Sequence, residues 1–145
     1  MITRDQYYNI IRMYYSFLVD RYDFTEVTYK KNNSMLYDLE YTDGKKIISI
    51  SYEIMGEGIN IVIFKVINGR RSGYDDMNTI HLNQIVKKLY ESGKMERFHE
   101  EKQFIKPYEQ PDTELEKEAL KKAELLSYVM NLEDFIINLF TRQVT

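Results

Sequence analysis

The chain has 145 residues and a formal net charge of −3, with 43% hydrophobic and 30% charged residues. This length and balance predict one globular domain over residues 1–145, with a core large enough to fold alone. The small net charge argues against nucleic acid as a partner. No segment approaches the ~18 uncharged apolar residues of a membrane-spanning helix, so the sequence predicts none.

The chain has no cysteine, which excludes disulfides, cysteine nucleophiles and cysteine-ligated metal centres. Its first residues, MITRDQYYNIIR, carry charges and lack the apolar run of a signal peptide. We therefore expect a cytoplasmic protein.

Residues 3–20 have the pattern of an amphipathic helix. Thr3 and Gln6 stand at the spacing of a capping box, which satisfies backbone N–H groups at a helix start. Apolar residues recur at helical intervals and form one stripe: Tyr7, Ile10, Ile11, Tyr14, Phe17 and Leu18.

Alternating apolar segments then predict a four-stranded antiparallel meander. The strands are expected at 25–31, at 35–41 and as a pair within 46–67. The turns between them are residues 32–34, Asp43-Gly44 and residues 56–58, of which Asp-Gly is the strongest hairpin signal.

These turns set the expected registers. A three-residue first loop pairs Val27 with Leu39 and keeps one face apolar, whereas a two-residue loop would pair Glu26 with Leu39. The second turn pairs Leu39 with Ile48, and the third pairs Ile48 with Val66. The helices should cover the resulting apolar face: Val27, Tyr29, Tyr37, Leu39, Ile48, Ile50, Tyr52, Val62, Phe64 and Val66.

In that register the last strand is apolar on its reverse side as well, through Ile61, Ile63 and Ile67. One interpretation is that a second helix or long polar neighbours cover this patch. The other is a contact with a second subunit or a partner, because large exposed apolar patches usually mark interaction surfaces.

Helical patterns return after the sheet. Asn78 or Thr79 begins a helix that stops near Gly93, and Thr113 and Glu116 repeat the capping-box spacing at the start of a long helix. The order of one helix, four strands and two to three further helices predicts an α+β fold, with the helices packed on one face of the sheet.

No enzyme signature stands out. His99 lacks a second histidine four residues later, where a zinc-binding helix needs one, and we expect His81 to cap or orient a helix start. Gly56 and Gly58 lie between antiparallel strands, which is not the setting of a dinucleotide loop. We therefore expect no catalytic residue, no metal and no cofactor.

The most distinctive local segment is residues 69–76, GRRSGYDD. Arginine and tyrosine are over-represented at interface hot spots, so one interpretation is contact with a partner protein. The residues of that contact would be Arg70, Arg71, Tyr74, Asp75 and Asp76. The alternatives are a solvated loop whose charges neutralise one another and, less favoured because acids stand beside the arginines, an anion site.

The chain as a whole resembles the small α+β immunity proteins of bacterial polymorphic-toxin systems and related bacterial proteins. The segments that carry the resemblance are FLVDRYDF at 17–24, SISY at 49–52, INIVI at 59–63, HLNQIV at 81–86 and ELEKEAL at 114–120. The resemblance implies a cytoplasmic protein without chemistry of its own, which binds a cognate toxin domain and blocks it.

The sequence therefore predicts a non-enzymatic protein-binding module, most directly an immunity-like inhibitor. One alternative is a homo-oligomer with a structural or adaptor role, joined through the reverse apolar patch. The other is a small-molecule-binding domain whose pocket is lined by tyrosines: Tyr7, Tyr14, Tyr37 and Tyr52.

Overall fold

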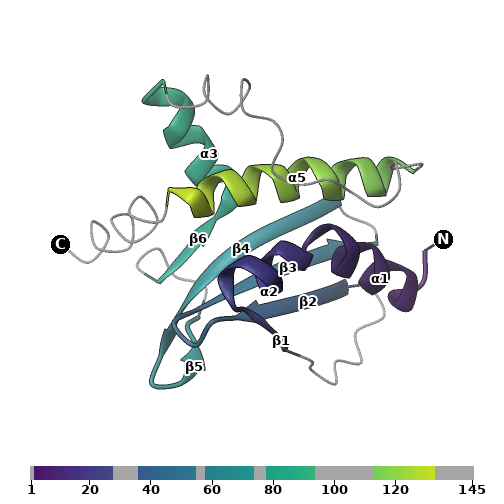
Figure 1. Cartoon of the computed structure of the whole chain (residues 1–145), viewed down its shortest axis with the longest axis horizontal. Coiled ribbons are helices and arrows are strands. Elements are labelled where there is room, and N and C mark those ends of the chain that lie inside the picture. Colours follow the sequence, from purple (N-terminus) through teal and green to yellow (C-terminus); the bar gives the residue numbers. More distant parts are fainter. Residues whose placement is uncertain (1, 28–35, 55–57, 74–77, 94–112, 133–145) are drawn as a thin grey trace.

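A computed structural model describes residues 2–27, 36–54, 58–73, 78–93 and 113–132. It confirms the α+β class, with an antiparallel sheet and helices packed on one of its faces (Figure 1). The helices are α1 (Arg4–Tyr14), α2 (Ser16–Tyr22), α3 (Leu82–Glu91) and α5 (Glu114–Asn131). The strands are β1 (Thr25–Val27), β2 (Leu36–Thr42), β3 (Lys46–Glu53), β4 (Gly58–Ile67), β5 (Arg70–Arg71) and β6 (Thr79–His81).

The first helix begins as predicted. Thr3 Oγ1 accepts the Gln6 N–H at 3.2 Å, and Gln6 Oε1 accepts the Thr3 N–H at 2.9 Å. The helix does not run unbroken, because the chain leaves helical geometry at Tyr15 and resumes as α2. Tyr15 is fully buried there, and its hydroxyl donates to the carbonyl of Ala119 in α5 at 3.1 Å.

Two strands were not predicted. No strand was expected between residue 67 and the helix starting at Asn78 or Thr79, but Asn68 and Gly69 both have positive φ (54° and 75°) and turn β4 back into β5. Two successive positive φ values are what a type I′ hairpin requires, and Asn-Gly is its preferred dipeptide. Thr79 belongs to β6, which pairs with β4, so α3 begins only at Leu82.

The β2–β3 register differs from the prediction by two residues, so the same face stays apolar. Leu39 pairs with Ile50. The turn has its positive-φ residue, Gly44 (φ 89°), in the first central position, which is the requirement of a type II′ turn. Asp43 precedes it and uses its Oδ1 to accept the backbone N–H of Lys46 at 2.9 Å.

The β1–β2 register also differs from the registers that the two predicted loops would give. Val27 pairs with Glu40, which places Val27 on the reverse face of the sheet. Glu26 instead lies on the helix-covered face, opposite Tyr41. There Arg12 of α1 donates to its carboxylate at 2.7 Å. The predicted place of Tyr29 lies outside the described residues.

The predicted β3–β4 register is wrong by an odd number of residues. The side chains predicted for one face of β4 therefore lie on the other face. Ile50 pairs with Ile61, not with Phe64, and Glu53 pairs with Gly58. The connection therefore spans residues 54–57 and is not a three-residue loop. Because β4 is apolar on both faces, the alternation of its sequence does not distinguish the two arrangements.

The predicted reverse patch is consequently not formed. Ile61 and Ile63 are 4% and 0% exposed and belong to the main core beneath the helices. Ile67, at the end of β4, is 42% exposed. A single exposed isoleucine is an ordinary surface feature, so the structural basis for a subunit contact through this patch is absent.

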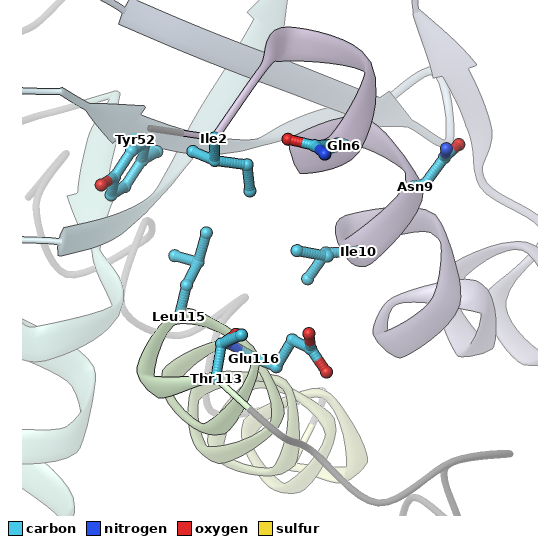
Figure 2. Close-up of a pocket in the computed structure, with 8 residues that line it drawn as sticks. All are labelled: Ile2, Gln6, Asn9, Ile10, Tyr52, Thr113, Leu115 and Glu116. Carbon is cyan, nitrogen blue, oxygen red and sulfur yellow. The ribbon is translucent and has the colours of Figure 1, made fainter.

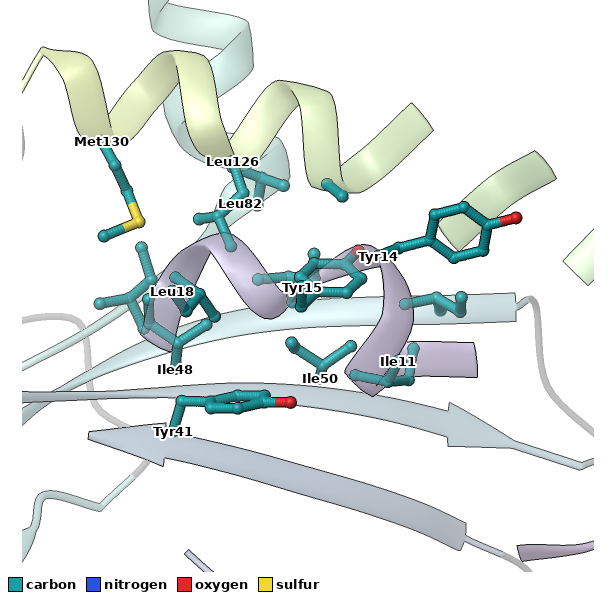
Figure 3. Packing of buried hydrophobic residues seen from close by; sticks show 14 of the residues in the cluster. Ile11, Tyr14, Tyr15, Leu18, Tyr41, Ile48, Ile50, Leu82, Leu126 and Met130 are labelled. Carbon is teal, nitrogen blue, oxygen red and sulfur yellow. The ribbon is translucent and has the colours of Figure 1, made fainter. Parts of the chain in front are cut away.

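The main core lies between the sheet and the helices α1, α2, α3 and α5 (Figure 3). Figure 3 shows Tyr15 and Leu18 above Ile50 and Ile48 of the sheet, with Leu126 and Met130 of α5 pointing into the same cluster. Helix α5 contacts α1, α3 and β4. Its residues 126–130 are all buried, so this part of α5 is enclosed on every side.

Helix α5 also closes an edge of β4. Strand β6 pairs only with residues 62–64, which leaves the outer edge of β4 without a neighbouring strand at Ile59. The carboxylate of Glu118 accepts the Ile59 N–H, and the Lys122 ammonium donates to the Ile59 carbonyl. Glu118 Oε1 and Lys122 Nζ lie 3.8 Å apart and form an ion pair on α5. This pair bonds the backbone groups of Ile59 that a neighbouring strand would otherwise bond.

Replacing Glu118 by alanine should therefore lower the free energy of unfolding. The Ile59 N–H would lose its acceptor in a partly buried setting, a loss of about 1–3 kcal/mol. Glu118→Gln keeps an acceptor oxygen and should cost less than the alanine variant. Urea denaturation measures both.

Glu114→Ala is the matched control, because this glutamate lies on the same helix with its side chain 93% exposed. It should change stability by no more than about 0.5 kcal/mol. Equal losses for Glu114→Ala and Glu118→Ala would contradict the role of Glu118 at the strand edge.

Candidate binding groove

The structure describes only the two arginines of the predicted partner-binding segment and places them differently. Arg70 is exposed beside the β4–β5 turn. Arg71 turns onto the reverse face of the sheet, where it donates to Glu40 Oε2 at 2.5 Å. Tyr74, Asp75 and Asp76 lie outside the described residues, so their predicted role stays a prediction.

Arg71 holds together the reverse side of the sheet. Its guanidinium carbon lies 4.5 Å from the ring centroid of Phe64, and its partner Glu40 has a fully buried side chain. Phe64 is the centre of a second, smaller apolar cluster: Ile47, Val62, Phe64 and Val66. Glu40 belongs to β2 and Arg71 to β5, with two strands between them, so the contact requires a curled sheet. Arg71 thus has a structural role.

Arg71→Ala should destabilise the fold strongly, because it leaves the Glu40 carboxylate buried beside an apolar cluster. Removing one member of a buried ion pair typically costs about 3–5 kcal/mol, and the partial exposure of Arg71 favours the lower end. Arg70→Ala removes the same charge from the neighbouring exposed position and should cost no more than about 0.5 kcal/mol. Thermal and urea unfolding of the two variants test this, and equal stabilities would contradict the structural role.

A groove of about 590 Å³ opens between the N-terminal half of α1 and the first turn of α5 (Figure 2). Its volume falls within the ~300–1,000 Å³ that is usual for ligand sites. Figure 2 shows Ile2 and Ile10 on the α1 side facing Leu115 on the α5 side, with Tyr52 of β3 at one end. The described residues that line it are Ile2, Gln6, Asn9, Ile10, Tyr52, Thr113, Leu115 and Glu116.

The two helix starts that form the walls are fixed by local hydrogen bonds. Besides the Thr3–Gln6 capping box of α1, Thr113 Oγ1 accepts the Glu116 N–H at 3.1 Å and caps α5. Both caps were predicted from the sequence and are confirmed. Further along, the Tyr15–Ala119 hydrogen bond joins the two helices. The groove is therefore bounded by backbone segments that are already ordered in the unbound protein.

A cluster of tyrosines supports the floor of the groove. The ring of Tyr52 stacks on Tyr7 with centroids 5.7 Å apart, and Tyr37 lies 6.4 Å from Tyr52. The Tyr7 hydroxyl donates to the Ile50 carbonyl at 2.8 Å, and the Tyr37 hydroxyl donates to the Ile2 carbonyl at 3.2 Å. Burial raises the pKa of Tyr7 well above its ordinary value, so this hydroxyl remains a donor.

The predicted tyrosine-lined pocket is thus only partly correct. Tyr52 lines the groove, whereas Tyr7, Tyr14 and Tyr37 are buried in the core. The space between the sheet and the helices is filled by these rings, and the groove lies beside them. Three groove residues with apolar side chains, Ile2, Ile10 and Leu115, are only partly buried.

The two histidines were the remaining candidates for a catalytic or metal-binding role. His81 has a structural role, and His99 lies outside the described residues. His81 occupies the N-cap of α3, and its backbone N–H donates to Gln84 Oε1 at 2.9 Å. Within the described residues, no three histidine, aspartate or glutamate side chains are grouped so as to hold a metal ion. In that same part of the chain, no helix combines the length and the hydrophobicity needed to cross a bilayer.

Comparison with known proteins found no match: no family model, no curated protein and no solved structure is similar to this chain. The resemblance to immunity proteins therefore stays a prediction. The groove has to be interpreted from its own described residues, which come from α1 and the residues before it, from β3 and from the start of α5.

Sequence reasoning missed the groove because no local pattern marks it. Ile10 was assigned to the apolar stripe of the first helix, and Gln6 and Thr113 were assigned to the caps of two separate helices. Those assignments are correct, but they do not reveal that the two helix starts lie side by side. The only available signal was an apolar stripe that extends to the first turn of each helix.

Proposed function

We propose that this protein is a non-enzymatic binding module that holds part of a partner protein in the groove between α1 and α5. The observation that carries the proposal is the groove itself. Its apolar residues Ile2, Ile10, Tyr52 and Leu115 are all partly buried, so they rest on the core and still present surface to a ligand.

The mixture of side chains in the groove is suited to a protein contact. Interface hot spots combine an apolar anchor in a pocket with surrounding polar groups that bond the partner. Here an anchor side chain would contact Ile10 and Leu115. Gln6, Asn9 and Glu116 line the same space and offer hydrogen-bonding groups.

The groove is also preformed, which lowers the cost of binding. Ordering loops and side chains on association opposes affinity, and walls that are already fixed avoid part of that cost. Both helix starts are capped, and Tyr52 is stacked against Tyr7. A partner would therefore bind to a surface whose backbone is already in place.

The resemblance to immunity proteins gives the class of partner that we propose, a toxin domain made by the same host. The protein would act by covering that domain and needs no reaction of its own. Arg70, exposed beside the β4–β5 turn, remains a candidate for an additional contact. Arg71 is not proposed as a contact, because its guanidinium bonds Glu40.

A small molecule is the second candidate occupant. The volume of about 590 Å³ favours it, because this is the size of an ordinary ligand pocket. Native mass spectrometry of the protein purified from its own host distinguishes the two. A bound mass of a few hundred daltons would favour the small molecule.

The proposal is tested by capture with groove variants. A tagged wild-type protein is expressed in its own host and compared with Leu115→Gln and Ile10→Gln, which replace an apolar wall by an amide of similar size. Because the partner's anchor would lose its apolar contact, we expect recovery of a stoichiometric partner to fall at least about tenfold, equivalent to ~1.4 kcal/mol.

Val19→Gln is the matched control, since Val19 is an apolar residue of α2 that is 45% exposed and lies outside the groove. It should recover the partner as the wild type does. The purified partner is then titrated against all four proteins by calorimetry. Equal affinity for the wild type and the two groove variants, with unchanged melting temperatures, would overturn the assignment of the groove.

A further inference from the structure

We infer that Tyr52 selects the occupant of the α1–α5 groove and that the anchor of this occupant is an aromatic ring. The inference rests on the proposed function and goes on to specify the chemistry of the partner. The segment held in the groove would present a phenylalanine, tyrosine or tryptophan side chain, with its ring against that of Tyr52.

The position of Tyr52 is the first observation. It is the aromatic residue among the described residues that line the groove. It is partly buried, whereas its ring neighbours Tyr7 and Tyr37 are buried in the core. Figure 2 shows Tyr52 at one end of the groove, next to Ile2 and Leu115. A ring that entered this end of the groove would therefore meet Tyr52 and be flanked by aliphatic side chains.

The ring of Tyr52 is held in place by two other tyrosines. It stacks on Tyr7 with centroids 5.7 Å apart and planes 23° apart, and the Tyr37 centroid lies 6.4 Å away. The rings of Tyr7 and Tyr37 are fixed in turn, because their hydroxyls donate to the carbonyls of Ile50 and Ile2. A ligand ring would extend this cluster without reordering Tyr52, which lowers the cost of binding.

Tyr52 also keeps the capacity for a further contact. Within the described part of the chain, its ring contacts are those with Tyr7 and Tyr37 alone, and its hydroxyl forms no hydrogen bond. The hydroxyls of Tyr7, Tyr15 and Tyr37, in contrast, each donate to a backbone carbonyl. Tyr52 can therefore offer a ligand both its ring and a hydrogen-bonding group.

An aliphatic anchor is the alternative, because Ile2, Ile10 and Leu115 would accept either kind of side chain. The gain from burying apolar area follows the area and does not distinguish an aliphatic group from an aromatic one. Paired aromatic rings attract each other beyond this gain, by an amount equivalent to about two- to tenfold in affinity. Tyr52 therefore favours the aromatic anchor.

Two neutral alcohols that differ only in their ring test the inference: 3-phenylpropanol and 3-cyclohexylpropanol. Each is titrated into the full chain, and binding is followed by the ¹³C-methyl signals of Ile2, Ile10 and Leu115. The cyclohexyl compound has the larger apolar surface, so burial alone would favour it. We expect the phenyl compound to bind at least about twofold more tightly, because only its ring can pair with Tyr52.

Tyr52→Leu keeps an apolar side chain and removes the ring, so it should abolish the preference for the phenyl compound. Tyr52→Phe keeps the ring and removes only the hydroxyl, so it should retain the preference. Tyr90→Leu is the control, because Tyr90 of α3 is 55% exposed and is not one of the residues that line the groove. It should leave the preference intact.

The outcomes separate the inference from the function on which it rests. Equal or tighter binding of the cyclohexyl compound to the wild type, or a preference that survives Tyr52→Leu, overturns the aromatic anchor and leaves the binding groove standing. The comparison on the wild type decides the matter even if Tyr52→Leu does not fold. Methyl signals that respond to neither compound show that the groove does not accept apolar groups, and both proposals then fail.

Discussion

Strand β4 packs against other residues on both of its faces and is bonded along both of its edges, and the rest of the described structure is arranged around it. Its isoleucines at 59, 61 and 63 form the core beneath the helices, while Phe64 on the reverse face is covered by Arg71. Its outer edge is shared by β6 and the Glu118–Lys122 pair of α5. This pair fixes the position of α5 relative to the sheet, and the first turn of α5 is one wall of the groove.

The sequence was sufficient for the two helix caps at Thr3 and Thr113, where the deciding contact is local. The Thr3 and Thr113 caps bond residues three positions away, and both were predicted. The Asn68-Gly69 turn was equally local, and its hairpin could have been predicted by the rule that was applied to Asp43-Gly44. The register of β4 could not, because a strand that is apolar on both faces fits either way. Its true register depends on contacts with α5, whose Glu118 is 59 residues distant from Ile59.

The candidate site also depends on contacts between residues that are distant in the sequence. Arginine is a common residue type at interfaces, so the sequence suggested a contact role for Arg71. Only the pairing of β5 reveals that its guanidinium forms an ion pair with Glu40, 31 residues earlier. The groove depends on α1 and α5 lying together, a contact across 104 residues at Tyr15 and Ala119. Tyr52 lines the groove, as expected for a residue of the predicted pocket, but the rings of Tyr7 and Tyr37 behind it fill the place where that pocket was predicted. The groove is the space that lies beside these packed tyrosines.

The register of β4 is tested most directly by cross-strand proton contacts in an NMR spectrum of the intact protein. The N–H and carbonyl of Ile59 point to α5, away from β3, so residues 59, 61 and 63 form non-hydrogen-bonded pairs with β3. The Cα atoms of such pairs lie about 4.5 Å apart, which gives strong Hα–Hα contacts. We expect these contacts between Ile50 and Ile61 and between Ile48 and Ile63. Contacts of Ile50 with Phe64 would contradict the arrangement and the position of α5 that depends on it.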